Sequence, residues 1–259
     1  MSESPSQKRV VIVPDPVSLA ASVAARFLRR LAEGLSDGQV VHVVLTGGTI
    51  PTAILRAVGM QPARTTVDWS RVHFWWGADR FVPRDDDARN EKTARAVLLD
   101  RLDVPAGNLH TVPSPDDGTD LDESVEAYAA ELARFGEGDR PWPSFDVCLL
   151  DVATDAHIAA LFPDRPEIQV TGRSVVAVRD APMPPADRIT LTRPVLNSSR
   201  EVWLVVTGAD KASALGLVLA GASYEGVPAA GAKGRERTLL FVDRAAAADV
   251  PAELIEPED

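Results

Sequence analysis

The sequence predicts an α/β fold, built as a modified doubly wound, mainly parallel sheet with helices on both faces and a small antiparallel excursion. Short apolar runs such as Phe145 to Leu150 alternate with amphipathic helical patterns along nearly the whole chain, which is typical of parallel strands covered by helices. Two segments at 174–178 and 188–192, the second with clear alternation, fit antiparallel strands at the sheet edge. We expect one domain at residues 9–248, with polar tails at 1–8 and 249–259.

The composition excludes several classes of protein. The formal net charge of −11 argues against binding nucleic acid or an anionic membrane surface through bulk electrostatics. No apolar run reaches the length of about 18 residues that a membrane-spanning helix needs. The single cysteine, Cys148, cannot form an intramolecular disulfide, which favours a reducing compartment. We therefore expect a cytoplasmic protein.

The first part of the chain has the pattern of two strand–helix units. A strand is expected at Arg9 to Pro14, followed by a helix from Asp15 to Leu35 in which apolar residues recur at four-residue steps. The second unit has an almost wholly apolar strand at Val40 to Leu45 and a helix that begins at Pro51. Such units place the ends of their strands at one edge of a parallel sheet.

The turn between the second strand and its helix contains Gly47, Gly48 and Thr49. Glycine lets the backbone approach an anion closely, and the first amides of a helix have no partner within the helix. These features suit a phosphate site. A Gly-Gly turn also occurs for purely geometric reasons, and the pattern alone does not decide between the two interpretations.

The third strand, Val72 to Trp76, leads to Arg80 at the same edge of the sheet. A guanidinium there could hold a phosphate or carboxylate with two hydrogen bonds, or form a salt bridge with Asp79 or with the acidic run at 85–87. We interpret that run as a solvated entry to the helix opened by Asn90, because we find no further ligands that would complete a metal site.

The later elements continue the alternation of strands and helices. We expect them, in order, as a strand at Leu109–Val112, a helix at Ser124–Phe135, the strand at Phe145–Leu150, the antiparallel pair, a short helix at Pro194–Ser199, a strand at Val202–Val206, a helix at Gly208–Leu219, a strand at Thr238–Val242 and a final Ala-rich helix after Asp243.

The strand at Phe145 to Leu150 runs into a turn that carries His157, followed by a short apolar helix at Ile158 to Phe162. Ligands of open α/β sheets bind beyond the carboxyl ends of strands, so a titratable imidazole at this place is a candidate for chemistry. The alternative is that His157 only caps or packs the turn. The spacing alone leaves both interpretations open.

Five segments together resemble the 6-phosphogluconolactonase family over roughly residues 9 to 248. They are TGGTIP at 46–51, WWGADRFVP at 75–83, DAHIAALFP at 155–163, PPADRITLT at 184–192 and VTGADKA at 206–212. The resemblance implies a cytosolic hydrolase of the pentose phosphate pathway that opens 6-phospho-D-glucono-1,5-lactone to 6-phosphogluconate without a cofactor or metal. It also implies a fold similar to that of the glucosamine-6-phosphate isomerases. We expect a monomer or small homo-oligomer.

The resemblance also assigns roles to residues. His157 would take a proton from the water that attacks the lactone carbonyl, and Asp155 would orient its ring. Arg80 would serve the phosphate or the developing oxyanion. Lys211 and Asp243 match positions that we expect to be mainly structural. The residues expected to bind substrate are Gly47, Gly48, Thr49, Arg80, Asn90 and Arg188.

The chain departs from the family pattern around the expected ligand. Alanine at a position that requires a positive φ costs about 1 kcal/mol, and loss of a phosphate-binding lysine weakens binding about ten- to a hundredfold. We therefore expect reduced activity. The departures are Asp151, Ala153 and Ala156 in place of turn glycines, Ala78 in place of an acidic residue, Ala160 in place of a small hydroxyl residue, and Met183 in place of a lysine.

Two alternative functions follow from these observations. The clustered departures suit a catalytically disabled relative that still binds a sugar phosphate. The Asp-x-His-Ile-Ala sequence at 155–159 also resembles amino-sugar-phosphate isomerases and deaminases, although the Leu-Phe-Pro at 161–163 favours the lactonase.

Overall fold

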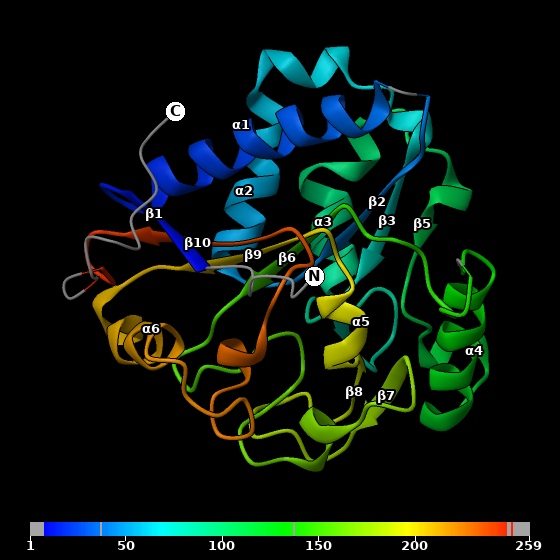
Figure 1. Cartoon of the computed structure of the whole chain (residues 1–259). Helices are drawn as coiled ribbons and strands as arrows, with labels where there is room; N and C mark the ends of the chain where they lie inside the picture. The colour runs from blue at the N-terminus through cyan, green and yellow to red at the C-terminus, as the bar shows by residue number, and fades with distance from the viewer. Residues whose placement is uncertain (1–7, 37, 137, 248–249, 251–259) are drawn as a thin grey trace.

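The computed structural model of the chain describes residues 8–36, 38–136, 138–247 and 250 (Figure 1). The polar tails predicted from the sequence lie almost entirely outside these residues. The first strand begins at Lys8, where it pairs with Thr238, so it includes one residue that we assigned to the N-terminal tail.

The main sheet is parallel at every pairing, as the uniformly apolar strands predict. Within the described residues it has seven strands in the order β1-β10-β9-β6-β2-β3-β5. Their bounds are β1 Lys8–Val13, β2 Val41–Leu45, β3 Val72–Trp76, β5 Leu109–His110, β6 Val147–Asp151, β9 Glu201–Val206 and β10 Arg237–Asp243.

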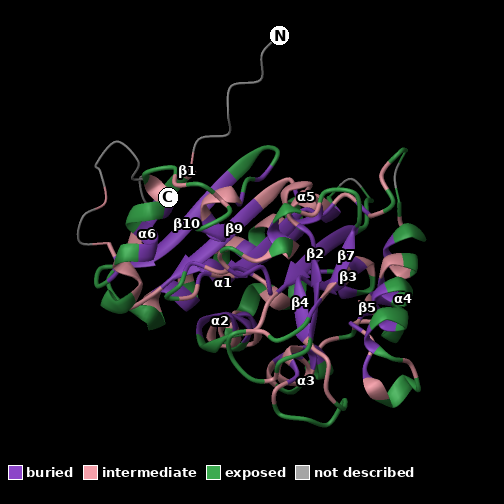
Figure 2. Cartoon of the chain, turned by 90° about the horizontal axis from the view of Figure 1, so that it is seen from below, coloured by how far each residue is buried: buried purple, intermediate pink, exposed green. Residues whose placement is uncertain are grey.

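These strands form the centre of the hydrophobic core. All five residues of β2 are buried, and the fully buried side chains include Trp75 and Trp76 of β3 and Trp203 of β9. Figure 2 shows the strands of the main sheet as almost continuously buried, whereas the helices around them keep an exposed side. A sheet buried on both faces cannot show the alternating pattern of a half-exposed strand.

Helices cover the main sheet on both sides, with α1 and α2 on one side and α5 and α6 on the other (Figure 1). The start of α1 is capped by Asp15, which accepts a hydrogen bond from the Ser18 amide. The helices are α1 Pro16–Leu35, α2 Thr49–Met60, α3 Asn90–Val97, α4 Leu121–Ala133, α5 Arg193–Asn197 and α6 Ala212–Leu219. The short 3-10 turns are Pro62–Thr66, Trp69–Arg71, Leu99–Arg101, Ala106–Asn108, Pro115–Asp117, Pro166–Gln169, Ala209–Lys211 and Pro228–Gly231.

A second, small sheet is antiparallel and has the order β4-β8-β7. Its strands are β4 Ala78–Arg80, β7 Val175–Val178 and β8 Arg188–Leu191. The pairing of β7 with β8 confirms the predicted antiparallel excursion. Its placement at the edge of the main sheet is wrong, because the pair instead joins β4, a strand that the sequence did not predict.

Two predicted helices are absent from the described residues. The apolar run at Ile158 to Phe162 forms a turn closed by a bridge between Ile158 and Leu161, because Ala159 has a left-handed φ of 52° that no α-helix contains. The Ala-rich segment after Asp243 is a turn at 244–246 and not a helix. Among the described helices, none is long and apolar enough to cross a membrane.

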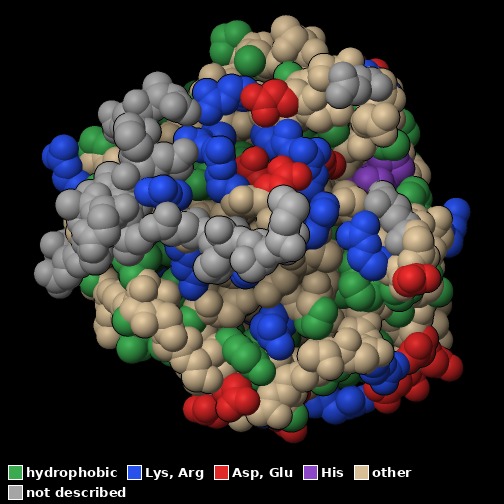
Figure 3. Space-filling model, viewed as in Figure 1, with side chains coloured by type: hydrophobic (Ala, Val, Ile, Leu, Met, Phe, Trp, Pro, Cys, Tyr) green, Lys and Arg blue, Asp and Glu red, His purple; other side chains and the backbone are tan. Residues whose placement is uncertain are grey.

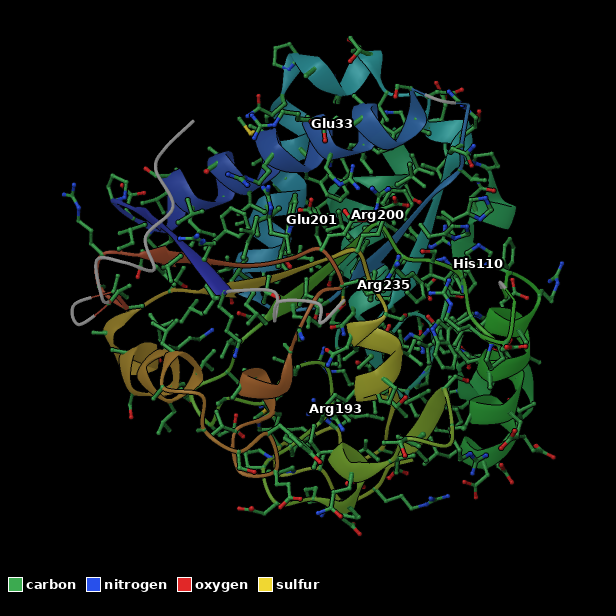
Figure 4. All side chains as sticks on the ribbon, viewed as in Figure 1. Glu33, His110, Arg193, Arg200, Glu201 and Arg235 are labelled. Atoms are coloured by element: carbon green, nitrogen blue, oxygen red, sulfur yellow. The ribbon has the colours of Figure 1, made fainter. Side chains whose placement is uncertain are left out.

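Ion pairs gather at the amino ends of β6 and β9. The Arg30 guanidinium lies 3.4 Å from Glu201 and 4.0 Å from Asp146, and Arg200 lies 3.5 Å from Asp146 and 2.8 Å from Glu236. Figure 4 shows Arg200 and Glu201 here, and Figure 3 shows basic and acidic side chains interspersed on this face of the molecule. These mutual ion pairs indicate a structural network, at the opposite end of the strands from the pocket described next.

Candidate active site

A pocket of about 230 Å³ opens at the carboxyl ends of β2, β3 and β6, between the main sheet and the small sheet. This is the edge at which open α/β sheets bind ligands. Its lining combines three cations with one imidazole and two carboxylates, and consists of Thr46, Gly47, Gly48, Ala78, Asp79, Arg80, Asn90, Asp151, Ala153, His157, Ala159, Met183, Arg188 and Lys211.

His157 is held by Asp155, two residues earlier in the turn. The Asp155 Oδ1 atom accepts hydrogen bonds from the His157 amide, at 3.0 Å, and from the ring Nδ1, at 2.7 Å. Burial raises the pKa of Asp155, but the bonds from His157 outweigh this effect and the pKa lies below its ordinary value. A carboxylate at Nδ1 fixes the proton of the neutral imidazole there, so Nε2 remains a free base.

Phe162 brings His157 and Arg188 together. Its buried ring lies 4.5 Å from the centroid of the His157 imidazole and 5.3 Å from the Arg188 guanidinium carbon. Arg188 also donates to the carbonyls of Met183, at 2.9 Å, and Pro185, at 3.3 Å, which fixes its position at the pocket wall. The imidazole and a guanidinium therefore share one support.

Arg80 and Arg188 are cross-strand neighbours in the small sheet. Like charges opposite each other destabilise a strand pair. Burial, and then the nearby Arg80, lower the pKa of Arg188 to about 10. In addition, the buried Arg80 Nε has no hydrogen-bond partner among the described residues. Two juxtaposed guanidiniums with an unsatisfied donor indicate a place for an anionic group.

Asn90 links Arg80 to the Gly47 turn. Its Oδ1 accepts from Arg80 Nη1, and its Nδ2 donates to the Ala78 carbonyl at 2.9 Å. A Cβ at residue 47 would collide with the Asn90 amide group, so the turn requires glycine there. Arg80 does not form the alternative salt bridge with Asp79, because the Asp79 carboxylate accepts instead from the backbone amides of Arg80, Asn90 and Glu91.

Gly48 has a φ of 120° and caps the amino end of α2. The helix starts at Thr49, two residues before the predicted start at Pro51. Gly48 lines the pocket, whereas Thr49 lines an adjoining hollow to which Arg80 and Asn90 also contribute. Of the predicted site residues, the structure thus gathers seven around one pocket and sets Thr49 beside it; the seven are Gly47, Gly48, Arg80, Asn90, Asp155, His157 and Arg188.

Comparison with known proteins decides the family. The sequence profile described as glucosamine-6-phosphate isomerases/6-phosphogluconolactonase matches residues 14–241. The chain belongs to this family. It is 40% identical to a 6-phosphogluconolactonase of Streptomyces coelicolor over 99% of both chains, and 42% identical to one of Mycobacterium tuberculosis over 94% of this chain and 98% of the relative. The crystal structure of a 6-phosphogluconolactonase from Thermotoga maritima superposes with a TM-score of 0.79 at 25% identity, covering 92% of this chain and all of the other.

Several residues that we expected to depart from the family pattern lie around this pocket. Ala78 and Ala160 belong to one small apolar cluster with Phe162 and Val178. Ala156 has a φ of 65°, the left-handed region that favours glycine, whereas Ala153 has no positive φ. The predicted backbone cost of the alanines therefore applies to Ala156 and not to Ala153.

The sequence did not predict the ion pair between Lys211 and Asp151 inside the pocket. Lys211 Nζ lies 3.1 Å from Asp151 Oδ1, with the two side chains 15% and 23% exposed. We expected Lys211 to be mainly structural, but it lines the pocket. Asp243, expected to be structural as well, accepts hydrogen bonds from the Gly208 and Ala246 amides. The signal for Lys211 was its place just beyond the carboxyl end of β9.

Proposed function

We propose that this chain hydrolyses 6-phospho-D-glucono-1,5-lactone to 6-phosphogluconate, as the names of its relatives state for those proteins. The observation that carries the proposal is the His157–Asp155 pair facing two arginines across one pocket. A base and an anion site in one enclosure match a substrate with an electrophilic carbonyl and a phosphate. The chain is therefore a carboxylic ester hydrolase.

The base in this mechanism is His157 Nε2. It takes a proton as a water oxygen bonds to the lactone carbonyl carbon, and Asp155 stabilises the imidazolium that forms. The imidazolium then gives the proton to the ring oxygen as the bond between that oxygen and the carbonyl carbon breaks. The products are the free hydroxyl and the carboxylic acid of 6-phosphogluconate, so the enzyme returns to its starting protonation state.

The arginines stabilise negative charge on the ligand. Arg188 shares the Phe162 support with His157, which puts it near the developing oxyanion, and Arg80 lies beside the Gly47–Gly48 turn, where a phosphate meets a helix amino end. This assignment requires no metal or cofactor, and the described residues contain no cluster of three or more His, Cys, Asp or Glu side chains that could hold a metal ion.

The test is hydrolysis of the lactone above its spontaneous rate. General-base catalysis contributes about 10²- to 10⁴-fold to a rate, so His157→Gln should reduce kcat by about a hundredfold or more. Arg80→Lys is the matched control, because it keeps the positive charge assigned to the phosphate, leaves the base intact and should mainly raise KM. Equal rates for the wild type and His157→Gln would refute base catalysis by this residue.

A second candidate is a sugar-phosphate binder without turnover, and the Asp151 carboxylate inside the pocket favours it. In that case 6-phosphogluconate binds, but the wild type adds nothing to the spontaneous rate of hydrolysis. We further propose a cytoplasmic location, supported by the single, buried and unpaired cysteine, Cys148.

A further inference from the structure

Asp151 brings a negative charge into a pocket whose ligand-facing cations are Arg80, Arg188 and Lys211. One of its oxygens pairs with Lys211 at 3.1 Å, and the other packs against Gly48, where an added Cβ would collide with it. The partly exposed pair lines the pocket wall, so a ligand that enters the pocket meets it.

The positive charge of Lys211 is therefore already paired with the Asp151 carboxylate before any ligand binds. Asp79, the other carboxylate of the lining, is engaged by backbone amides and by the nearby Arg89. It therefore does not compete with the ligand for the basic side chains of the pocket. A phosphate monoester carries about −1.5 to −2 charges at pH 7. To bind Lys211 it must displace Asp151 or lie beside it, and both alternatives weaken binding.

We propose that Asp151 is a specificity residue whose carboxylate competes with the anionic ligand for Lys211 and thereby lowers the affinity of the pocket for phosphate monoesters. The inference deepens the proposed function and rests on it for the identity of the ligand. It concerns binding alone, and so it can be tested without turnover.

The competition between Asp151 and the ligand depends on pH through the protonation state of Asp151. Burial raises the pKa of Asp151, against the attraction of Lys211 and of His157. A protonated Asp151 no longer competes, so competition is strongest above this pKa and fades as the pH falls through it. The other charged groups of the pocket are Arg80, Arg188 and Asp79, which a substitution at Asp151 leaves in place.

The experiment is calorimetric titration of 6-phosphogluconate and of inorganic phosphate into the wild type and Asp151→Asn. Removing the competing charge should tighten both dissociation constants by about tenfold. The dissociation constant of the wild type divided by that of Asp151→Asn cancels the titration of the ligand itself. This quotient should fall toward one as the pH is lowered through the pKa of Asp151. A purely structural role of Asp151 would not produce that trend.

The matched control is Asp87→Asn, which removes a carboxylate that also pairs with a lysine, Lys92 at 2.6 Å, but is 97% exposed. It should change neither dissociation constant by more than about twofold. If Asp151→Asn does not fold, as judged by its thermal melt, Asp151→Ser is measured in its place.

Each remaining outcome is decisive. Weaker binding by Asp151→Asn would mean that the carboxylate positions Lys211, and unchanged binding would place the pair outside the path of the ligand. Either result overturns the inference, as does an absence of binding by every variant. Tighter binding in a protein that does not hydrolyse the lactone would instead refute the proposed function and leave this inference standing.

Discussion

At the scale of single residues, Ala156 and Ala159 hold backbone conformations that ordinarily belong to glycine, with φ angles of 65° and 52°. For an L-residue this region costs about 1–2 kcal/mol. At Ala156, which is 3% exposed, the buried methyl group returns about 0.8 kcal/mol, so replacement by glycine should change stability little. At the half-buried Ala159 the methyl group contributes less, and the strain dominates.

We therefore expect Ala159→Gly to stabilise the protein by about 0.5–1 kcal/mol. The matched control is Ala153→Gly, since Ala153 also lines the pocket and is half-buried but has no positive φ. That change should destabilise by about 0.5–1 kcal/mol. Urea unfolding of the two variants measures the difference, and an equal effect of both would contradict the assignment of strain to Ala159.

At the scale of elements, three of the four histidines lie together on β2, β3 and β5, away from the pocket. His73 Nδ1 bonds to His110 Nε2 at 2.8 Å, and His110 Nδ1 bonds to Glu131 of α4 at 2.8 Å. The Trp75 indole donates to His42 Nδ1 at 3.0 Å, which requires that nitrogen to be unprotonated. The network holds all three rings in their neutral form.

This network predicts acid sensitivity. Burial, followed by repulsion from neighbouring histidines, lowers the pKa of His42 to about 3 and that of His73 to about 4, and burial lowers the pKa of His110 as well. Because these folded pKa values lie below the unfolded value of 6.5, their stabilisation is complete above pH 6.5 and is lost as the pH falls below it. His42 alone accounts for about 2 kcal/mol between neutral pH and pH 5.

Urea unfolding between pH 7.5 and 5 tests this prediction. As the pH is lowered, the free energy of unfolding should fall. Its slope against pH should correspond to more than one proton taken up on unfolding. In His42→Asn, whose amide oxygen takes the place of Nδ1 and can accept from Trp75, the slope should be shallower by about one proton. A free energy that stays constant over this range would show that the histidines titrate normally.

The start of α3 is a second element that determines the site. Asp79 is 1% exposed and accepts from the first amides of this helix, which fixes Asn90 against both Arg80 and Gly47. Burial raises the pKa of Asp79, against the opposing charge of Arg89. Arg80 is therefore oriented by a buried carboxylate that does not itself contact its guanidinium.

At the scale of the whole molecule, most strands of the main sheet could be located from the sequence because segments such as β2 and β6 are largely apolar and buried. The sequence could not reveal β4, since the three residues Ala78–Arg80 carry no periodicity and pair with β8 far along the chain. The prediction of a helix after His157 was also wrong. The apolar residues of this segment form a turn and pack into the two hydrophobic clusters, which their composition alone does not distinguish from a helix.

The site was predictable to the extent that strand ends share one edge. This rule predicts from the sequence alone that Gly48, Arg80 and His157 lie together. It could not pair Asp151 with Lys211, because the contact depends on side-chain direction across 60 residues of sequence. Family resemblance also obscured this pair, since it marked Asp151 only as a lost glycine.

The most direct test of the whole account is a crystal structure of the wild type at saturating 6-phosphogluconate. We expect the product in this pocket, with its C1 carboxylate within hydrogen-bond reach of His157 Nε2 and its phosphate on Arg80. A product bound elsewhere, or bound here with C1 turned away from His157, would contradict it.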